Sequence, residues 1–140
     1  MTMKTYLALA LLITVLAGNA YGDGEIYYCA ETEDNGFGFD ENLKKYKRSG
    51  FQTSKFKIKF DRTAKTLEIK GHQMDAVNRT YPCTAPYAII DEPELLTCTS
   101  GLYHFNFNSD NGRFVSAEIF GYVAGDTDSI SVSYGKCDKF

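Results

Sequence analysis

The last third of the chain, residues 102–137, carries the alternation of apolar and polar side chains that most restricts its fold. Tyr103, Phe105 and Phe107 alternate with polar residues, so they share one face of a predicted β-strand. The Asn111-Gly112 pair that follows is a strong hairpin signal, because both residues tolerate positive φ. Further strands are expected over 113–123 and 130–134. The segment therefore predicts a meander of three antiparallel strands joined by tight turns.

Shorter alternating segments precede this meander. Strands are expected over 25–32, 55–60, 66–70, 87–90 and 95–99. The stretches at 40–49 and 71–86 lack a clear period and are expected to be irregular. The pattern predicts about seven to nine short strands with almost no helix, which is a single antiparallel all-β domain.

The strand expected over 113–123 has apolar residues on both faces, such as Phe114 and Tyr122 on one and Val115 and Ile119 on the other. A strand that is covered on both sides favours a sandwich or a small barrel over one open sheet. Closure into a barrel would also bring the first and last strands together, and both carry a cysteine. We therefore favour a small β-barrel, with a β-sandwich as the alternative.

The chain has four cysteines, Cys29, Cys83, Cys98 and Cys137. In an exported domain this even number predicts two disulfides, for which three pairings are possible. We favour Cys29–Cys137, which would tie the opening strand to the closing one, and Cys83–Cys98, which would clip a local loop. A zinc site is the competing interpretation, but no Cys-x-x-Cys motif is present and neither histidine has ligand-like spacing to the cysteines. We expect no metal or other cofactor.

The first residues read as a targeting segment. Lys4 precedes an apolar run over 6–16, and small residues follow it over 17–22. This pattern predicts a cleaved signal peptide over 1–22, with cleavage after Ala20 or Gly22, and an all-β domain over 23–140. An uncleaved anchor is the alternative. The mature protein is expected to be secreted or periplasmic, with no transmembrane segment after signal removal.

The charge and the motifs of the chain disfavour several classes of function. The formal net charge of −3 argues against a nucleic-acid partner. No serine stands in a Gly-x-Ser-x-Gly motif, and there is no phosphate-binding loop. We predict that the protein is not an enzyme. A hydrolase would need His72 or His104 beside a serine or a carboxylate in a cleft. The lysines at 55, 57 and 59 are expected to form a solvated sheet face, with a basic binding stripe as the alternative.

A binding function is easier to motivate from the aromatic residues. Tyr103, Phe105, Phe107 and Tyr122 are candidates to contact a small apolar or amphipathic ligand, and an aromatic-rich core is the simpler interpretation of the same residues. The alternative function is a protein-interaction module, such as a periplasmic lysozyme or protease inhibitor. In that case the segments 35–39 and 99–103 should be exposed beside a flat or concave surface.

Two resemblances extend these expectations. Tyr27-Tyr28-Cys29, Gly36-Phe37 and the ending Gly135-Lys136-Cys137 resemble small uncharacterised exported bacterial β-proteins, a group that implies no function. The same Tyr-x-Cys strand, with Cys137 and Ser100-Gly101-Leu102-Tyr103, is similar to MliC-type periplasmic lysozyme inhibitors. That resemblance implies an eight-stranded barrel, a Cys29–Cys137 disulfide and an inhibitory Ser-Gly-x-x-Tyr-type loop. Tyr103 stands one position early, and the Lys-Gly-Asp-Glu-Ala segment of that family is missing.

Overall fold

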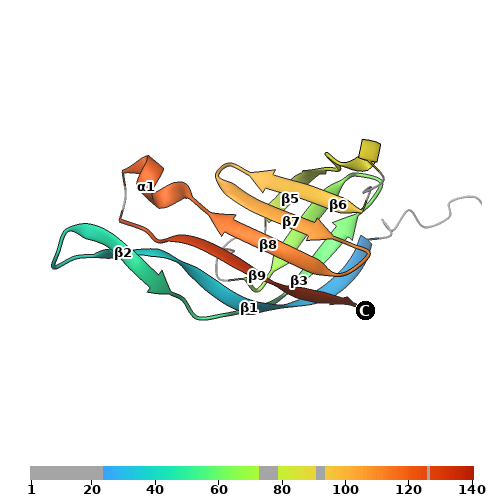
Figure 1. Ribbon diagram of the computed structural model, residues 1–140. Helices are drawn as coiled ribbons and strands as arrows, with labels where there is room; N and C mark the ends of the chain where they lie inside the picture. Colours follow the sequence, from blue (N-terminus) through green and yellow to red (C-terminus); the bar gives the residue numbers. More distant parts are fainter. Residues whose placement is uncertain (1–23, 73–78, 91–93, 126) are drawn as a thin grey trace, which may run out of the picture.

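The computed structural model describes residues 24–72, 79–90, 94–125 and 127–140, so the expected signal peptide lies outside the described residues. It is an all-β structure (Figure 1). Its elements are β1 (Gly24–Asp40), β2 (Lys45–Gly50), β3 (Lys55–Asp61), β4 (Thr66–Lys70), β5 (Arg79–Thr84), the 3₁₀ helix η1 (Ala88–Ile90), β6 (Leu95–Ser100), β7 (Tyr103–Asn108), β8 (Arg113–Glu118), α1 (Phe120–Ala124) and β9 (Ile130–Lys139). In this part of the chain, no helix has the length and apolar content needed to cross a membrane.

Eight of the strands form a closed antiparallel barrel, which confirms the predicted fold class and the choice of a barrel over a sandwich. The strands follow one another from β3 to β9, and β1 pairs with both β3 and β9 to close the ring. The ninth strand, β2, pairs only with residues 35–40 of β1. Residues 35–50 project beyond the barrel on the same side as α1 (Figure 1), with residues 35–37 of β1 still paired with β9, and we call this segment the arm.

Both favoured disulfides are present and each links directly paired residues. Cys29 and Cys137 join β1 to β9 with a Cα–Cα distance of 3.9 Å. Cys83 and Cys98 join β5 to β6 at 4.0 Å. All four cysteines are therefore used, which excludes a zinc site made from them. Near the first disulfide, β1 and β9 approach so closely that a Cβ on Gly135 would lie 2.1 Å from the Ala30 carbonyl oxygen.

The barrel interior is filled by aromatic side chains. Phe105 and Phe114 stack with ring centroids 5.3 Å apart, and Phe56 packs edge-on against Phe114 at 5.2 Å. Tyr27 and Phe107 form another edge-to-face pair at 5.0 Å. Such offset and edge-on pairs contribute about 0.5–1.5 kcal/mol beyond the apolar area that they bury. The predicted inward alternation of β7 is thus the basis of the core.

The strand expected over 113–123 is wrong in its second half, because β8 ends at Glu118 and residues 120–124 form the short helix α1. Gly121 permits a close approach there, since a Cβ at this position would lie 2.5 Å from Cβ of Asp128. Gly125 ends the helix with a φ of 85°. Tyr122 consequently leaves the sheet.

Three further expectations about local structure are wrong. Residues 40–49 are not a loop, because Asp40 accepts hydrogen bonds from the backbone N–H groups of Asn42 and Leu43 and turns the chain tightly into β2. This turn also lets β1 continue to residue 40. The irregular stretch at 71–86 contains β5, and the strand expected at 87–90 contains η1.

One end of the barrel carries an ion-pair network centred on Arg62. The Arg62 guanidinium lies 3.0 Å from Glu25 and 3.1 Å from Glu94, and Lys139 lies 3.1 Å from Glu25. The hydrogen bond from Arg62 lowers the pKa of Glu25 to about 2. Tyr27 also donates to Glu25 at 2.6 Å. The opposite end of the barrel is built very differently.

The stacked interior predicts a large difference between inward and outward residues of the same sheet. We expect Phe105→Ala, which removes a ring that is 2% exposed, to lower the free energy of unfolding by about 3–5 kcal/mol. Val115→Ala, at a residue that is 42% exposed, should cost less than about 1 kcal/mol. Urea unfolding of both variants tests this, and comparable losses would contradict the described packing.

Candidate functional site

The end of the barrel opposite Arg62 carries mainly polar side chains, whereas the rest of the interior is filled by aromatic ones. The side chains at this end surround a pocket of about 170 Å³, which we call the mouth pocket. The residues that line it are Glu31, Asp34, Phe51, His72, Glu118, Ser129 and Ser131. They come from β1, from the segments around residues 51 and 72, from the end of β8 and from the start of β9. Three carboxylates therefore meet at one end of a barrel whose interior is apolar.

A β-bulge places two of these carboxylates on the same side of β1. Glu31 pairs with Gly135 and Glu33 pairs with Tyr134, so Thr32 is an extra residue in the ladder. Residues three apart on a regular strand face opposite ways, but the bulge restores the inward direction at Asp34. The bulge in the pairing of β1 with β9 therefore places two of the three carboxylates in the mouth pocket.

Glu31 forms a buried pair with His72. Glu31 Oε1 and His72 Nε2 are 2.9 Å apart, and the two side chains are 2% and 4% exposed. The other carboxylate oxygen, Oε2, accepts the Ser54 backbone N–H at 2.6 Å and the Ser54 hydroxyl at 2.9 Å. Burial opposes the charge of Glu31, but the hydrogen bonds from Ser133, Ser54 and His72 outweigh it and lower the pKa of Glu31. Glu31 is thus held as a carboxylate.

Asp34 lies in a less favourable setting. Its Oδ1 atom is buried and has no hydrogen-bond partner within the described structure. Burial first, and the neighbouring charge of Glu31 second, raise the pKa of Asp34. A buried acceptor without a donor costs free energy that a bound donor would recover. Asp34 therefore offers the mouth pocket an oxygen that is ready to accept a hydrogen bond.

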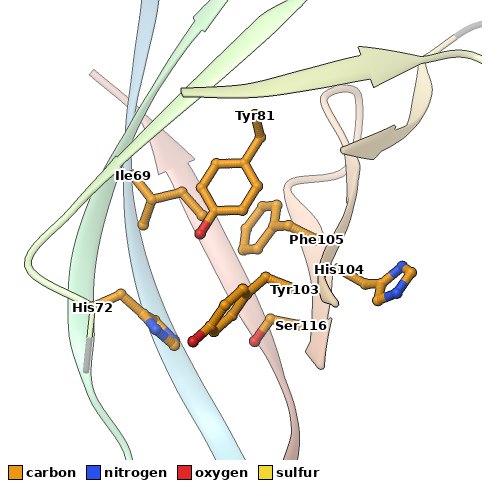
Figure 2. Close-up of a pocket in the computed structure, with 7 residues that line it drawn as sticks. All are labelled: Ile69, His72, Tyr81, Tyr103, His104, Phe105 and Ser116. Carbon is orange, nitrogen blue, oxygen red and sulfur yellow. The ribbon is translucent and has the colours of Figure 1, made fainter. Parts of the chain in front are cut away.

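Deeper in the barrel, the space beside His72 is very small. A cavity of about 10 Å³ lies between His72, Tyr81 and Tyr103, which is the room of a single water molecule. Figure 2 shows the rings of His72 and Tyr103 turned towards each other and His104 turned away from them. Ser116, which also lines this cavity, shares a buried hydrogen bond of 2.7 Å with Ser133 between their hydroxyls.

The structure brings three of the four predicted ligand-binding residues together, because Tyr103 and Phe105 line one small cavity and the rings of Phe105 and Phe107 lie 6.4 Å apart, but it places Tyr122 elsewhere. Phe105 and Phe107 are core residues, 2% and 0% exposed. Tyr103 lies near the mouth, opposite Glu118 in the pairing of β7 with β8. Tyr122 lies on α1, is 65% exposed, and packs edge-on against Tyr46 of the arm. A role of these four residues in ligand binding stays a prediction.

The sequence analysis did not identify the residues of the mouth pocket as a site. The bulge that turns Asp34 inward leaves no local sequence signal. The serines of β9 gave none either, because Ser131 and Ser133 are buried while Val132 between them is 48% exposed, the reverse of simple hydrophobic alternation. His72 was considered only as a general base, and it does lie beside a carboxylate. However, the hydroxyl of Ser54 is used as a donor to Glu31, which is not the arrangement of an activated nucleophile.

Comparisons of the chain with protein-family models, with curated proteins and with solved structures gave no match.

The buried Glu31–His72 pair leads to a prediction about stability and pH. Glu31→Gln keeps the size of the side chain and an acceptor for Ser54 but removes the charge, so we expect a loss of about 1.5–3 kcal/mol at pH 7. Because the folded pKa of Glu31 is lowered, its contribution is complete above its ordinary pKa of 4.5 and disappears as the pH falls through the folded value. The difference in the free energy of unfolding between wild type and variant should therefore become smaller as the pH is lowered from 7 to 3. Glu41→Gln, in an exposed pair with Lys44, serves as the control and should change little.

Asp34 should behave in the opposite way. Because the folded pKa of Asp34 is raised, the charged carboxylate destabilises the folded state at any pH above that folded pKa. This destabilisation disappears once the pH falls below the ordinary pKa of 3.8, where Asp34 is protonated in both the folded and the unfolded state. We expect Asp34→Asn to be more stable than wild type at pH 7 and to lose this advantage near pH 3. Thermal unfolding at the two pH values measures the difference, with Asp110→Asn in an exposed turn as the control. A variant that is less stable at pH 7 would show that the Asp34 charge is already compensated.

Proposed function

We propose that this protein is an exported, non-enzymatic module that binds another protein at the mouth of the barrel, as an inhibitor of a lysozyme or a protease would. The observation that carries the proposal is that two segments distant in sequence each adjoin a residue that lines the mouth pocket. Residues 35–39 continue β1 from Asp34 into the arm. Residues 99–103 span the end of β6, the turn that follows and the start of β7, where Tyr103 is paired with Glu118 of the pocket.

The surface around the mouth is suited to a protein partner. Phe37 of the arm is 50% exposed, Leu43 at its tip is 59% exposed, and Tyr122 and Val123 of α1 are 65% and 71% exposed. Large aromatic side chains of this kind supply much of the binding energy in protein interfaces at little entropic cost. Tyr122 also lies in a defined position, because Tyr46 packs against its ring and donates its hydroxyl to the Asp128 carbonyl at 2.9 Å.

The mouth pocket adds charge to this apolar surface. Its three carboxylates and its volume of about 170 Å³ fit the end of a lysine or arginine side chain. Such a side chain would supply a donor to the unpartnered oxygen of Asp34. The proposed partner therefore inserts a basic residue into the mouth while its surroundings contact the arm and α1.

A small apolar or amphipathic ligand, the first expectation from the sequence, has less support. Among the described residues, the interior cavity beside Tyr103 measures about 10 Å³. Drug-sized ligands occupy pockets of about 300–1,000 Å³. A small ligand would have to bind outside the aromatic core.

The proposal is tested by titrating the protein against a panel of lysozymes and secreted proteases and measuring residual enzyme activity. We expect inhibition of at least one enzyme, and a loss of about tenfold or more in affinity for Phe37→Ala and for Tyr122→Ala. Val115→Ala on the outer wall is the matched control and should inhibit like wild type. If no enzyme of the panel is inhibited, the inhibitor function is wrong.

Native mass spectrometry separates the two kinds of partner. A bare native mass of the purified protein agrees with a protein partner. A retained small molecule that is lost on denaturation would favour the alternative.

A further inference from the structure

The outer wall of the barrel carries an open groove of about 550 Å³ where β1, β3, β4 and β9 lie side by side. It shares no lining residue with the mouth pocket. The side chains along it include four lysines and one carboxylate: Lys55, Lys57, Lys70, Lys136 and Asp138. We propose that this groove binds an anionic oligosaccharide, one that carries carboxylate or sulfate groups.

The strand register explains why the groove is hollow. Ala30 of β1 is paired with Lys55 on one side and with Lys136 on the other. Neighbouring strands are about 4.8 Å apart, so a methyl side chain stands between two long lysine side chains. Gly71, at the end of β4, adds no side chain to the wall. The result is a depression with ammonium groups on both sides.

The charges of the groove are poorly compensated within the chain. Lys57 and Lys70 are directly paired on β3 and β4, and like charges in this position destabilise a sheet. Of the four lysines, Lys70 alone has an ion pair within the described residues, with Glu68 at 2.9 Å. A solvated lysine face was expected from the sequence. The strand register brings lysines from three strands together around one depression. This local positive charge lies in a chain whose net charge is −3.

Tyr28 gives the groove a feature that an inorganic anion would not need. Its side chain is 54% exposed, and its ring packs edge-on against Phe140 at 5.8 Å. A second hollow of about 140 Å³ adjoins the groove at Tyr28 and contains Lys59 and Ile26. A sugar ring can place its C–H bonds on an aromatic face while its acidic substituents meet ammonium groups. The row of hollows past Tyr28 favours a chain of several sugars.

Other anionic partners fit this surface less well. A bilayer is flat at this scale, and it would leave the floor of the groove at Ala30 uncontacted. A single-stranded nucleic acid is usually bound through several stacked bases and a broad basic field, whereas the groove has one exposed ring in a chain of negative net charge. The saccharide uses both the charges and the concave shape.

The experiment is isothermal titration calorimetry of the protein with oligogalacturonate and with dextran sulfate, at low and at physiological salt. We expect binding that weakens with salt, and no binding of neutral dextran. Lys57→Gln/Lys70→Gln should weaken binding about tenfold, which corresponds to about 1.4 kcal/mol. Lys45→Gln/Arg48→Gln on β2 removes the same charge away from the groove and should leave the affinity within about twofold. Tyr28→Ala should weaken binding of both saccharides and leave the melting temperature nearly unchanged.

Several results would overturn the proposal. Equal losses in the two double variants would mean that net charge alone is measured. An unchanged affinity for Tyr28→Ala would remove the sugar-ring contact. Tighter binding of vesicles of phosphatidylglycerol in phosphatidylcholine, or of single-stranded DNA, would assign the groove to a membrane or to a nucleic acid. If the wild-type protein binds neither saccharide, the proposal that the groove binds an anionic oligosaccharide is wrong.

Discussion

The pairing of β1 with β9 is the constraint on which the rest of the molecule depends, because it turns an open meander into a barrel. The two strands join residues 108 positions apart in sequence at the Cys29–Cys137 disulfide. Closing a loop of about 100 residues by a disulfide stabilises a fold by about 4.7 kcal/mol in chain-entropy models. The approach of the two backbones is close enough that Gly135 has no room for a side chain. The same seam contains the bulge that turns Asp34 inward, so closure and site construction have one origin.

β1 connects the three surfaces that carry the functional argument. Its inward residues Glu31 and Asp34 form part of the mouth pocket, and its outward residues Tyr28 and Ala30 line the groove on the outer wall. Beyond the bulge it leaves β3, pairs with β2 and becomes the arm. A strand of 17 residues is far longer than the usual strand of about five or six. Its length lets one element contribute to an inner pocket, an outer groove and a projecting aromatic surface.

The fold could be predicted further than the site, for physical reasons. Period-two alternation in β7, the hairpin over β3 and β4, and both disulfides depend on local pattern or on cysteine number, and each is present. Which face of β9 points into the barrel depends on contacts with other strands and cannot be predicted from the local sequence. Val132 and Tyr134 are 48% and 46% exposed while Ser131 and Ser133 are buried, which is the reverse of simple hydrophobic alternation. The aromatic rings of facing strands already fill the interior, so small residues fit on β9. The bulge and the helical turn α1 likewise depend on contacts that the sequence pattern does not show.

Two places in the structure contain unfavourable polar contacts: a buried acceptor without a donor, and two like charges that are directly paired. At the mouth, the carboxylate of Asp34 is buried beside Glu31 with an oxygen that has no donor in the described structure. On the outer wall, Lys57 and Lys70 face each other across β3 and β4. Both arrangements cost folding free energy, and a neutral residue at each position would remove the cost. Local conflicts of this kind concentrate at functional sites, where a ligand supplies the missing donor or the missing charge. The mouth lacks a hydrogen-bond donor and the outer wall lacks an anion, so the two sites would be satisfied by groups of opposite charge.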